Sequence, residues 1–153
     1  MGRTLKQKAA SERGAELIEF ALALPLLLVI IMGIFDFGLA FQRYEVLTNA
    51  AREGARLGSL QATYSQADIE DRVLDYAEAA GLNRNDVTPV VTMNQDISLA
   101  GGTTVNGVRV RVDFTHQFSF VGPIMALIGA NSMTSVTLRA TSTMRREGIA
   151  AGS

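Results

Sequence analysis

The hydrophobic and polar positions divide the chain into two regions of different pattern. From Phe20 to Phe41 almost every residue is apolar, and Asp36 is the one charged residue in this run. As a helix the run is about 33 Å long, at about 1.5 Å per residue, and a bilayer core is about 30 Å thick. A buried core helix would need polar positions on one face. The pattern therefore predicts a single membrane-spanning helix near the N-terminus.

The segment before the apolar run is basic. Residues 1–14 carry Arg3, Lys6, Lys8 and Arg13, and cationic flanks are retained on the cytoplasmic side of a membrane. We therefore expect the N-terminus inside and the residues after 42 outside. A cleaved secretory signal is the main alternative, because the Gly-Leu-Ala sequence at 38–40 weakly imitates its cleavage site. The apolar part of such signals is about 7–15 residues long, which is shorter than this run.

The helix is expected to continue outside the membrane as far as Leu60. Residues 42–60 contain no proline, and their small side chains recur at helical spacing. Each glycine costs a helix about 1 kcal/mol relative to alanine, so close approach to another element should compensate. Packing on the chain's own sheet is the favoured interpretation, and packing on another subunit's helix stays open. The residues at this helical spacing, which form one stripe along the helix, are Leu47, Ala50 or Ala51, Gly54 or Ala55, and Gly58.

A second, shorter helix is predicted after residue 64. Ser65 and Asp68 approximate a capping box at its start, and Gly81 is suited to end it. Apolar residues between them recur at helical spacing. The polar residues 83–86 then predict a turn.

Three later segments predict strands. Residues 105–114 and 134–145 alternate between apolar and polar side chains. Residues 87–93 are rich in β-branched side chains, and Pro89 marks an edge strand or a short one, with a polar loop or hairpin connection at 94–103. The fold class is therefore α+β: a long N-terminal membrane-spanning helix that continues outside, a second short helix, and a small antiparallel sheet of about three strands.

The expected domain organisation follows from these elements. We expect a basic cytoplasmic leader at 1–14, a transmembrane and extended helix at 15–60, an extracytoplasmic α+β domain at 61–147, and a flexible tail at 148–153. Within the domain, residues 118–131 are expected to form a loop and short helix over the dry face of the sheet. An exposed patch for a neighbouring subunit or the outer leaflet is the alternative.

The composition offers little for catalysis. The chain has no cysteine, one histidine and a net charge of −1, which excludes thiol chemistry and a two-histidine metal site and gives no sign of a nucleic-acid partner. No serine lies in a nucleophile elbow, and no glycine-rich loop has phosphate-binding spacing. We therefore expect a protein that is not an enzyme and has no metal, cofactor or small-molecule substrate. His116 is expected at the surface or at a strand end, and Asp36 at the outer membrane interface in reach of water.

Glu19 is the most informative polar residue. It opens the apolar run, where an ionised carboxylate costs about 2–3 kcal/mol unless it has a partner. It lies either at the headgroup level or opposite a specific cation. A cut between Gly14 and Ala15 would create such a cation, because the new α-amino group of Ala15 in a neighbouring helix could pair with Glu19. Glu16 is a second acid in the same turn, so both carboxylates stay candidates.

These residues resemble a known processing site. Gly14 and Ala15, followed by Glu19 and Phe20 at the fifth and sixth positions after the glycine, resemble the type IV pilin site at which a prepilin peptidase removes a basic leader. The stretches RGAELIEFALALPLLLVIIMGIFDFG at 13–38 and NAAREGAR at 49–56 resemble the TadE-like family of minor pseudopilins of tight-adherence pili. TLRATSTMRRE at 137–147 is similar to the end of that family's domain.

The resemblance implies a minor pilin or pseudopilin, held in the cytoplasmic membrane and taking part in assembly of a tight-adherence pilus, with a role in cell adhesion. Its partners would be membrane lipid, a prepilin peptidase, and other pilins and assembly proteins. Gly14, Ala15, Glu19 and Phe20 would serve processing, while Glu19, Pro25, Ala50, Gly54 and Gly58 would serve assembly or helix packing, with Pro25 as a point where the helix can bend. An uncleaved membrane-tethered binding module is the alternative function, and a signal-cleaved secreted domain is a third.

Overall fold

The computed structural model describes residues 3–60, 64–100, 102–127, 129–130, 132 and 134–146, with side chains from Gly14 onward. The tail predicted at 148–153 lies outside the described residues. In chain order the elements are α1 (Arg3–Ser59), α2 (Gln66–Ala79), the 3-10 turn η1 (Arg84–Asp86), β1 (Val87–Ser98), β2 (Thr104–Gln117), α3 (Val121–Leu127) and β3 (Ser135–Arg145).

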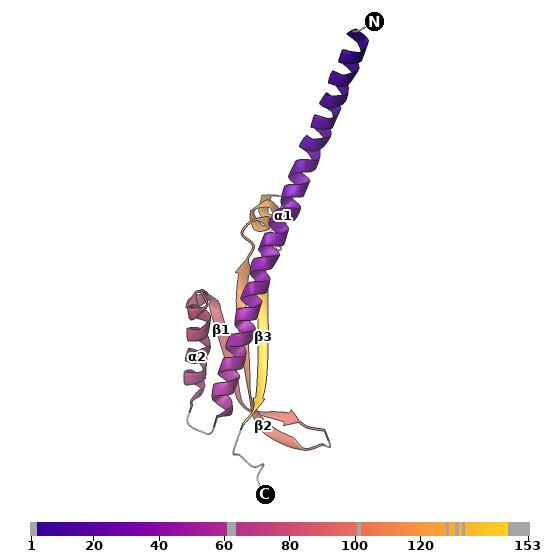
Figure 1. Cartoon of the computed structure of the whole chain (residues 1–153). Helices are drawn as coiled ribbons and strands as arrows, with labels where there is room; N and C mark the ends of the chain where they lie inside the picture. The colour runs from indigo at the N-terminus through magenta and orange to yellow at the C-terminus, as the bar shows by residue number, and fades with distance from the viewer. Residues whose placement is uncertain are drawn as a thin grey trace.

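The long helix α1 dominates the molecule. It is continuous over 57 residues and runs through Pro25 without interruption. Its C-terminal half lies along the sheet and beside α2, while its N-terminal half projects away from the rest of the chain (Figure 1). The predicted continuation of the apolar helix outside the membrane segment is therefore confirmed.

The sheet has three antiparallel strands in the order β1-β2-β3. Pro89 lies in the edge strand β1, opposite Val112, as its missing donor predicts. β1 is longer than predicted. A register shift between Thr92 and Gln95 contains Asn94, whose φ is +57°, and pairing with β2 then resumes to Ser98. The expected hairpin connection is present, but it is shorter than predicted because this bulge lets the strand turn and continue before the turn after Ser98.

The core lies between one face of the sheet and the two helices α1 and α2. Alternate residues of β2 point into it, and Val108, Val110 and Val112 are fully buried. From α1 and α2 the fully buried side chains are Leu47, Ala50, Ala51, Ala55, Ile69, Val73 and Ala77. The predicted α+β arrangement, with an antiparallel sheet backed by helices, is confirmed.

The ends of α2 follow the sequence signals closely. Ser65 Oγ accepts a hydrogen bond from the Asp68 amide at 3.3 Å, and the Asp68 carboxylate accepts one from the Ser65 amide at 2.7 Å. Gly81 follows the helix with φ of +87°, and the next amide, of Leu82, donates to the Ala77 carbonyl. Both predicted caps are therefore present, in the form of a capping box and a Schellman turn.

The short helix α3 is not where we expected it. It packs beside α1, near Gly33 and Asp36, beyond the end of the sheet that lies nearer the membrane segment (Figure 1). The prediction that residues 118–131 cover the dry face of the sheet was wrong, because α1 and α2 already occupy that face.

Candidate functional site

The projecting half of α1 is bare. Residues 15–31 are all exposed in the isolated chain, with Leu22 75% exposed and Phe20 60% exposed. Among the described residues, one helix, Gly14–Ser59, is long and apolar enough to cross a membrane. Apolar surface of this extent needs a cover other than water. The segment therefore has the character of a single-pass membrane anchor.

The predicted processing residues lie within two turns of this bare helix. Glu19 is one turn beyond Ala15, and both are exposed. A side chain built at Gly14 meets no atom within 4 Å, so the glycine is not required by any contact within the described chain. A glycine here lowers helix stability by about 1 kcal/mol relative to alanine. The structure gives the four residues a common location without assigning them a role.

Three of the predicted packing residues, Ala50, Gly54 and Gly58, lie elsewhere on the same helix. Ala50 is fully buried. A Cβ atom added at Gly54 would lie 2.5 Å from a methyl of Val73, and one added at Gly58 would lie 2.9 Å from methyls of Ile69 and Val108. Their close approach is to the chain's own α2 and β2. At about 1.5 Å per residue, Gly54 lies about 50 Å from Glu19. The structure therefore separates these three residues from Glu19, which was predicted to serve both processing and packing. Pro25 lies in the bare half, where every neighbouring side chain is exposed.

Asp36 is fully buried, and its carboxylate is held by backbone amides. Its Oδ1 accepts from the Ser119 amide at 2.9 Å, and its Oδ2 accepts from the Phe120 and Val121 amides at 3.0 and 2.7 Å. These are donors at the start of α3 that have no partner within the helix itself. The expectation that Asp36 faces water was wrong, because α3 folds back on it.

His116 is also buried, which corrects the expectation of a surface residue. Arg43 Nη1 lies 2.6 Å from its Nδ1, and the Phe118 ring packs edge-on against the imidazole at 5.3 Å between centroids. Because arginine only donates, Nδ1 accepts and the ring proton is on Nε2. Burial, and then the nearby guanidinium of Arg43, lower the pKa of His116 below its usual value. The imidazole is therefore kept neutral.

Sequence reasoning missed how these residues join. Asp36, Arg43 and His116 connect α1 to the end of β2 and the start of α3, across more than 70 positions of sequence. The signals available were that Asp36 is the one charge in an apolar run and that His116 is the one histidine. Neither signal predicts which residue the side chain contacts.

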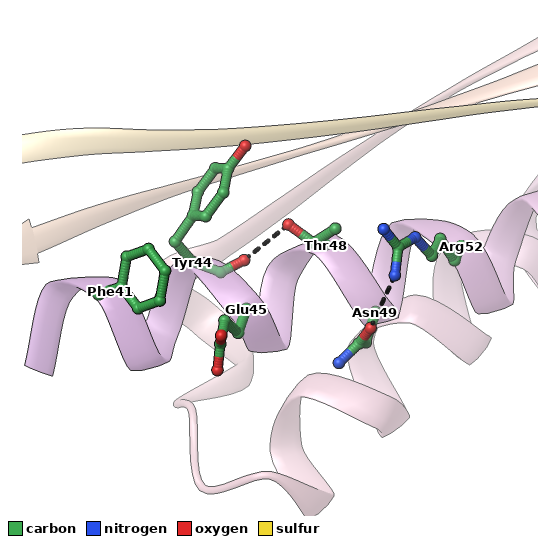
Figure 2. Close-up of a pocket in the computed structure, with 6 residues that line it drawn as sticks. All are labelled: Phe41, Tyr44, Glu45, Thr48, Asn49 and Arg52. Carbon is green, nitrogen blue, oxygen red and sulfur yellow. Dashed lines mark hydrogen bonds between the residues drawn. The ribbon is translucent and has the colours of Figure 1, made fainter.

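The outward face of α1 carries a shallow pocket of about 420 Å³, shown in Figure 2. Within it Thr48 Oγ1 donates to the Tyr44 carbonyl at 2.8 Å, and Arg52 Nη1 donates to Asn49 Oδ1 at 3.4 Å. All six lining side chains come from one helix face at spacings of three or four residues, so the pocket is a ridged surface rather than a cleft. They are Phe41, Tyr44, Glu45, Thr48, Asn49 and Arg52.

Ion pairs on the domain surface tie its elements together. Glu53 on α1 accepts hydrogen bonds from Arg56 at 3.0 Å and from Arg72 on α2 at 2.8 Å, which lower its pKa to about 2. On the wet face of the sheet, Asp113 lies between Arg139 at 2.8 Å and Arg111 at 3.4 Å. This carboxylate offsets the positive stripe that the arginines alone would form. In the described part of the chain, no three His, Cys, Asp or Glu side chains gather as a metal site requires.

A bare apolar helix of membrane-spanning length, with a small α+β domain packed on its other half, defines a membrane-anchored class of protein. The family model described as TadE-like protein matches residues 14–56. The resemblance to the TadE-like family is thus confirmed over this part of α1, from Gly14 to Arg56. Neither the curated proteins nor the solved structures include a significant match to the chain.

Proposed function

We propose that this protein is a minor pilin-like subunit that takes part in assembly of a tight-adherence pilus. A prepilin peptidase removes the basic leader after Gly14, and the processed subunit stays in the cytoplasmic membrane with its domain outside until it joins other pilins or assembly proteins. It acts by packing its helix against neighbours, and not as an enzyme.

One observation carries the proposal. The TadE-like match begins at Gly14, the residue that precedes the proposed cut, and covers the whole bare segment of α1. A helix that is exposed on every side over residues 15–31 suits two successive environments, lipid and a bundle of similar helices, because neither requires a polar face.

The chemistry of processing explains why Glu19 stands at the inner end of the span. Hydrolysis of the Gly14–Ala15 bond leaves a new α-amino group at Ala15, which is mostly protonated near neutral pH. In a neighbouring subunit this ammonium can pair with the Glu19 carboxylate. In a low-dielectric surrounding such a pair is favoured over either charge alone, so it fixes the axial stagger of two helices.

The exposed face of α1 supports the same use. At 3.6 residues per turn, Glu19, Phe37, Phe41 and Tyr44 lie within about 60° of one another around the helix axis. Phe41 and Tyr44 also line the shallow pocket of Figure 2. One face therefore joins the inner charge to a ridged outer surface on which Phe37, Phe41 and Tyr44 stay exposed, although Phe37 also contacts the Phe118 ring at its edge. This is the surface we assign to a neighbouring helix.

The first experiment is N-terminal sequencing of the mature protein from cells that contain a prepilin peptidase. We expect Ala15 at the N-terminus, and we expect Gly14→Leu to abolish processing and leave the longer chain. Because a Cβ at Gly14 meets no described atom within 4 Å, the loss would reflect the peptidase. Gly38→Leu, at another open glycine of the same helix, is the matched control and should be processed normally.

The same measurement separates the alternatives. An N-terminus at Met1 or Gly2 in the presence of the peptidase would support the uncleaved tether, and one near Phe41 would support a secreted domain. Either result would overturn the proposal.

The second experiment tests charge pairing. Glu19→Ala should be processed but should enter pili or pilin complexes poorly, as measured by the fraction that co-purifies with sheared filaments or crosslinked neighbours. Glu16→Ala is the matched control for the second acid of the same turn. Normal assembly of Glu19→Ala, or an equal defect in both variants, would contradict the role assigned to Glu19.

A further inference from the structure

A second uncharged stretch lies beside the membrane helix. Between His116 and Arg139 the sequence contains no charged residue, and it includes Phe118, Phe120 and the apolar turn of α3. Its described part leaves large apolar side chains exposed, with Leu127 87% exposed and Phe120 45% exposed. In a water-facing loop of a small domain such side chains have no stabilising partner.

The position of α3 is set by its contacts with α1. The Val121 methyl lies 3.9 Å from the Cβ position of Gly33, and the Phe35 and Phe120 rings are 6.4 Å apart between centroids. Figure 1 shows α3 where the bare half of α1 meets the domain. The apolar surface of α3 is therefore continuous with that of the span.

The depth of this contact can be placed along the helix. With the inner edge of the hydrocarbon at Phe20, a core of about 30 Å at about 1.5 Å per residue ends near residue 40. Asp36 then lies about 6 Å inside the outer edge of the hydrocarbon. An ionised carboxylate at that depth is costly when it has no partner.

Asp36 is compatible with this depth because α3 surrounds it with donors. The amides of residues 119–121 point at its two oxygens, and the carboxylate in turn supplies partners for donors that a short helix leaves unpaired. The carboxylate and the amides therefore satisfy each other's hydrogen-bonding capacity without water. The tip formed by residues 118–127 therefore presents exposed apolar side chains, while the amides of residues 119–121 are paired with Asp36.

We propose that residues 118–127, which include α3, embed in the outer leaflet of the bilayer beside the membrane-spanning helix. The occupant of the exposed apolar surface is lipid acyl chain, and the paired Phe35/Phe120 and Phe37/Phe118 rings lie just inside the outer edge of the hydrocarbon. The protein thus contacts the membrane through two elements, which fixes both the depth of the span and the tilt of the domain.

This inference needs the membrane anchor but not the pilus assignment. It applies equally to a processed and an unprocessed chain, so the identity of the N-terminal residue tests the proposed function separately.

The chain contains no tryptophan, so one introduced tryptophan is a unique optical reporter of its surroundings. The full chain with Leu127→Trp is reconstituted at low protein-to-lipid ratio in vesicles of phosphatidylethanolamine and phosphatidylglycerol whose acyl chains carry bromine, a contact quencher. Leu99→Trp is the matched control, because Leu99 is 42% exposed in the β1–β2 hairpin at the far end of the domain. Phe35→Trp is the reference for a side chain on the span.

We expect Trp emission from the Leu127→Trp protein to be blue-shifted, to lose most of its intensity in brominated lipid, and to resist iodide added to the water. The Phe35→Trp protein should behave in the same way, and the Leu99→Trp protein should show the opposite on all three counts. Emission from the Leu127→Trp protein that matches the Leu99→Trp control would overturn the proposal. So would protection that appears only at high protein-to-lipid ratio, because a second copy of the chain would then be the cover.

Discussion

The two halves of α1 belong to one helix but are built by different rules. Residues 15–31 carry bulky apolar side chains around the whole circumference, and all of them are exposed. The second half keeps polar side chains outside and turns a stripe of fully buried small residues, among them Ala50, Ala51 and Ala55, toward the sheet and α2. Large apolar residues suit the half that has the character of a membrane anchor, whereas small residues suit the half that packs closely on the chain's own sheet and α2.

The largest effect should come from filling the close approach in the packed half. A Cβ at Gly54 would already lie 2.5 Å from Val73, so Gly54→Leu should destabilise the domain by about 3 kcal/mol or more. Thermal unfolding of the full chain in detergent measures this loss. A Cβ at Gly38 meets no described atom within 4 Å, so Gly38→Leu should leave the domain unchanged. Equal unfolding temperatures for Gly54→Leu and Gly38→Leu would contradict the distinction between the packed half and the bare half.

The reverse experiment places a charge in the bare half. Leu26→Arg should cost about 2.5–3.5 kcal/mol of membrane insertion, while the unfolding temperature of the domain stays unchanged because Leu26 is exposed and remote from it. The fraction of the chain that resists alkaline extraction from membranes reports the first quantity. Leu26→Phe is the apolar control and should insert normally. A domain destabilised by Leu26→Arg would mean that the two halves are not independent.

A smaller effect is expected at the junction of the two halves. Asp36→Asn removes the charge that accepts the amides of residues 119–121, at a cost of about 2 kcal/mol. Hydrogen exchange of these amides should then quicken by roughly thirtyfold, since about 1.4 kcal/mol corresponds to a factor of ten. Amides of the β2–β3 ladder serve as the internal control. Unchanged exchange at 119–121 would show that Asp36 does not hold α3.

The smallest effect concerns the ion pairs that hold α2 on α1. The pKa of Glu53 is lowered to about 2 from 4.5 by Arg56 and Arg72. Its contribution is therefore complete above about pH 4.5 and is lost as the pH falls toward about 2. Glu53→Gln should remove about 0.5–1 kcal/mol at neutral pH and flatten the loss of stability in that acid range. Denaturant unfolding at several pH values tests this, with Glu45→Gln as the control on the exposed face of α1.

Sequence patterns predicted the local features of the fold well. The caps of α2 at Ser65 and Gly81, the alternation of Val108 to Phe114 and the edge position of Pro89 were all available, because each depends on neighbours within a few residues. The bulge at Asn94 was not, since a non-glycine residue at positive φ has only a weak sequence signal. The roles of Gly14, Ala15 and Glu19 stay predictions, because no contact within the chain bears on them.

The junction escaped prediction for a different reason. Asp36 and His116 were expected at a boundary and at the surface when taken alone, and each is buried because of partners distant in sequence. The isolated carboxylate needs hydrogen-bond donors, and the uncharged segment after His116 supplies them from its backbone amides. Hydrophobic periodicity describes each segment separately, so it does not predict that the two are in contact. Two departures from local expectation that satisfy each other are therefore worth searching for together.

The unbroken course of α1 also has a mechanical consequence. The strands β2 and β3 run alongside its packed half (Figure 1), so a pull on the N-terminal end loads the helix–sheet contact in shear, along its whole length at once. Contacts loaded in this way must yield together and not one after another. The domain is thus attached to its anchor along a parallel, overlapping contact, an arrangement that resists tension along the helix axis.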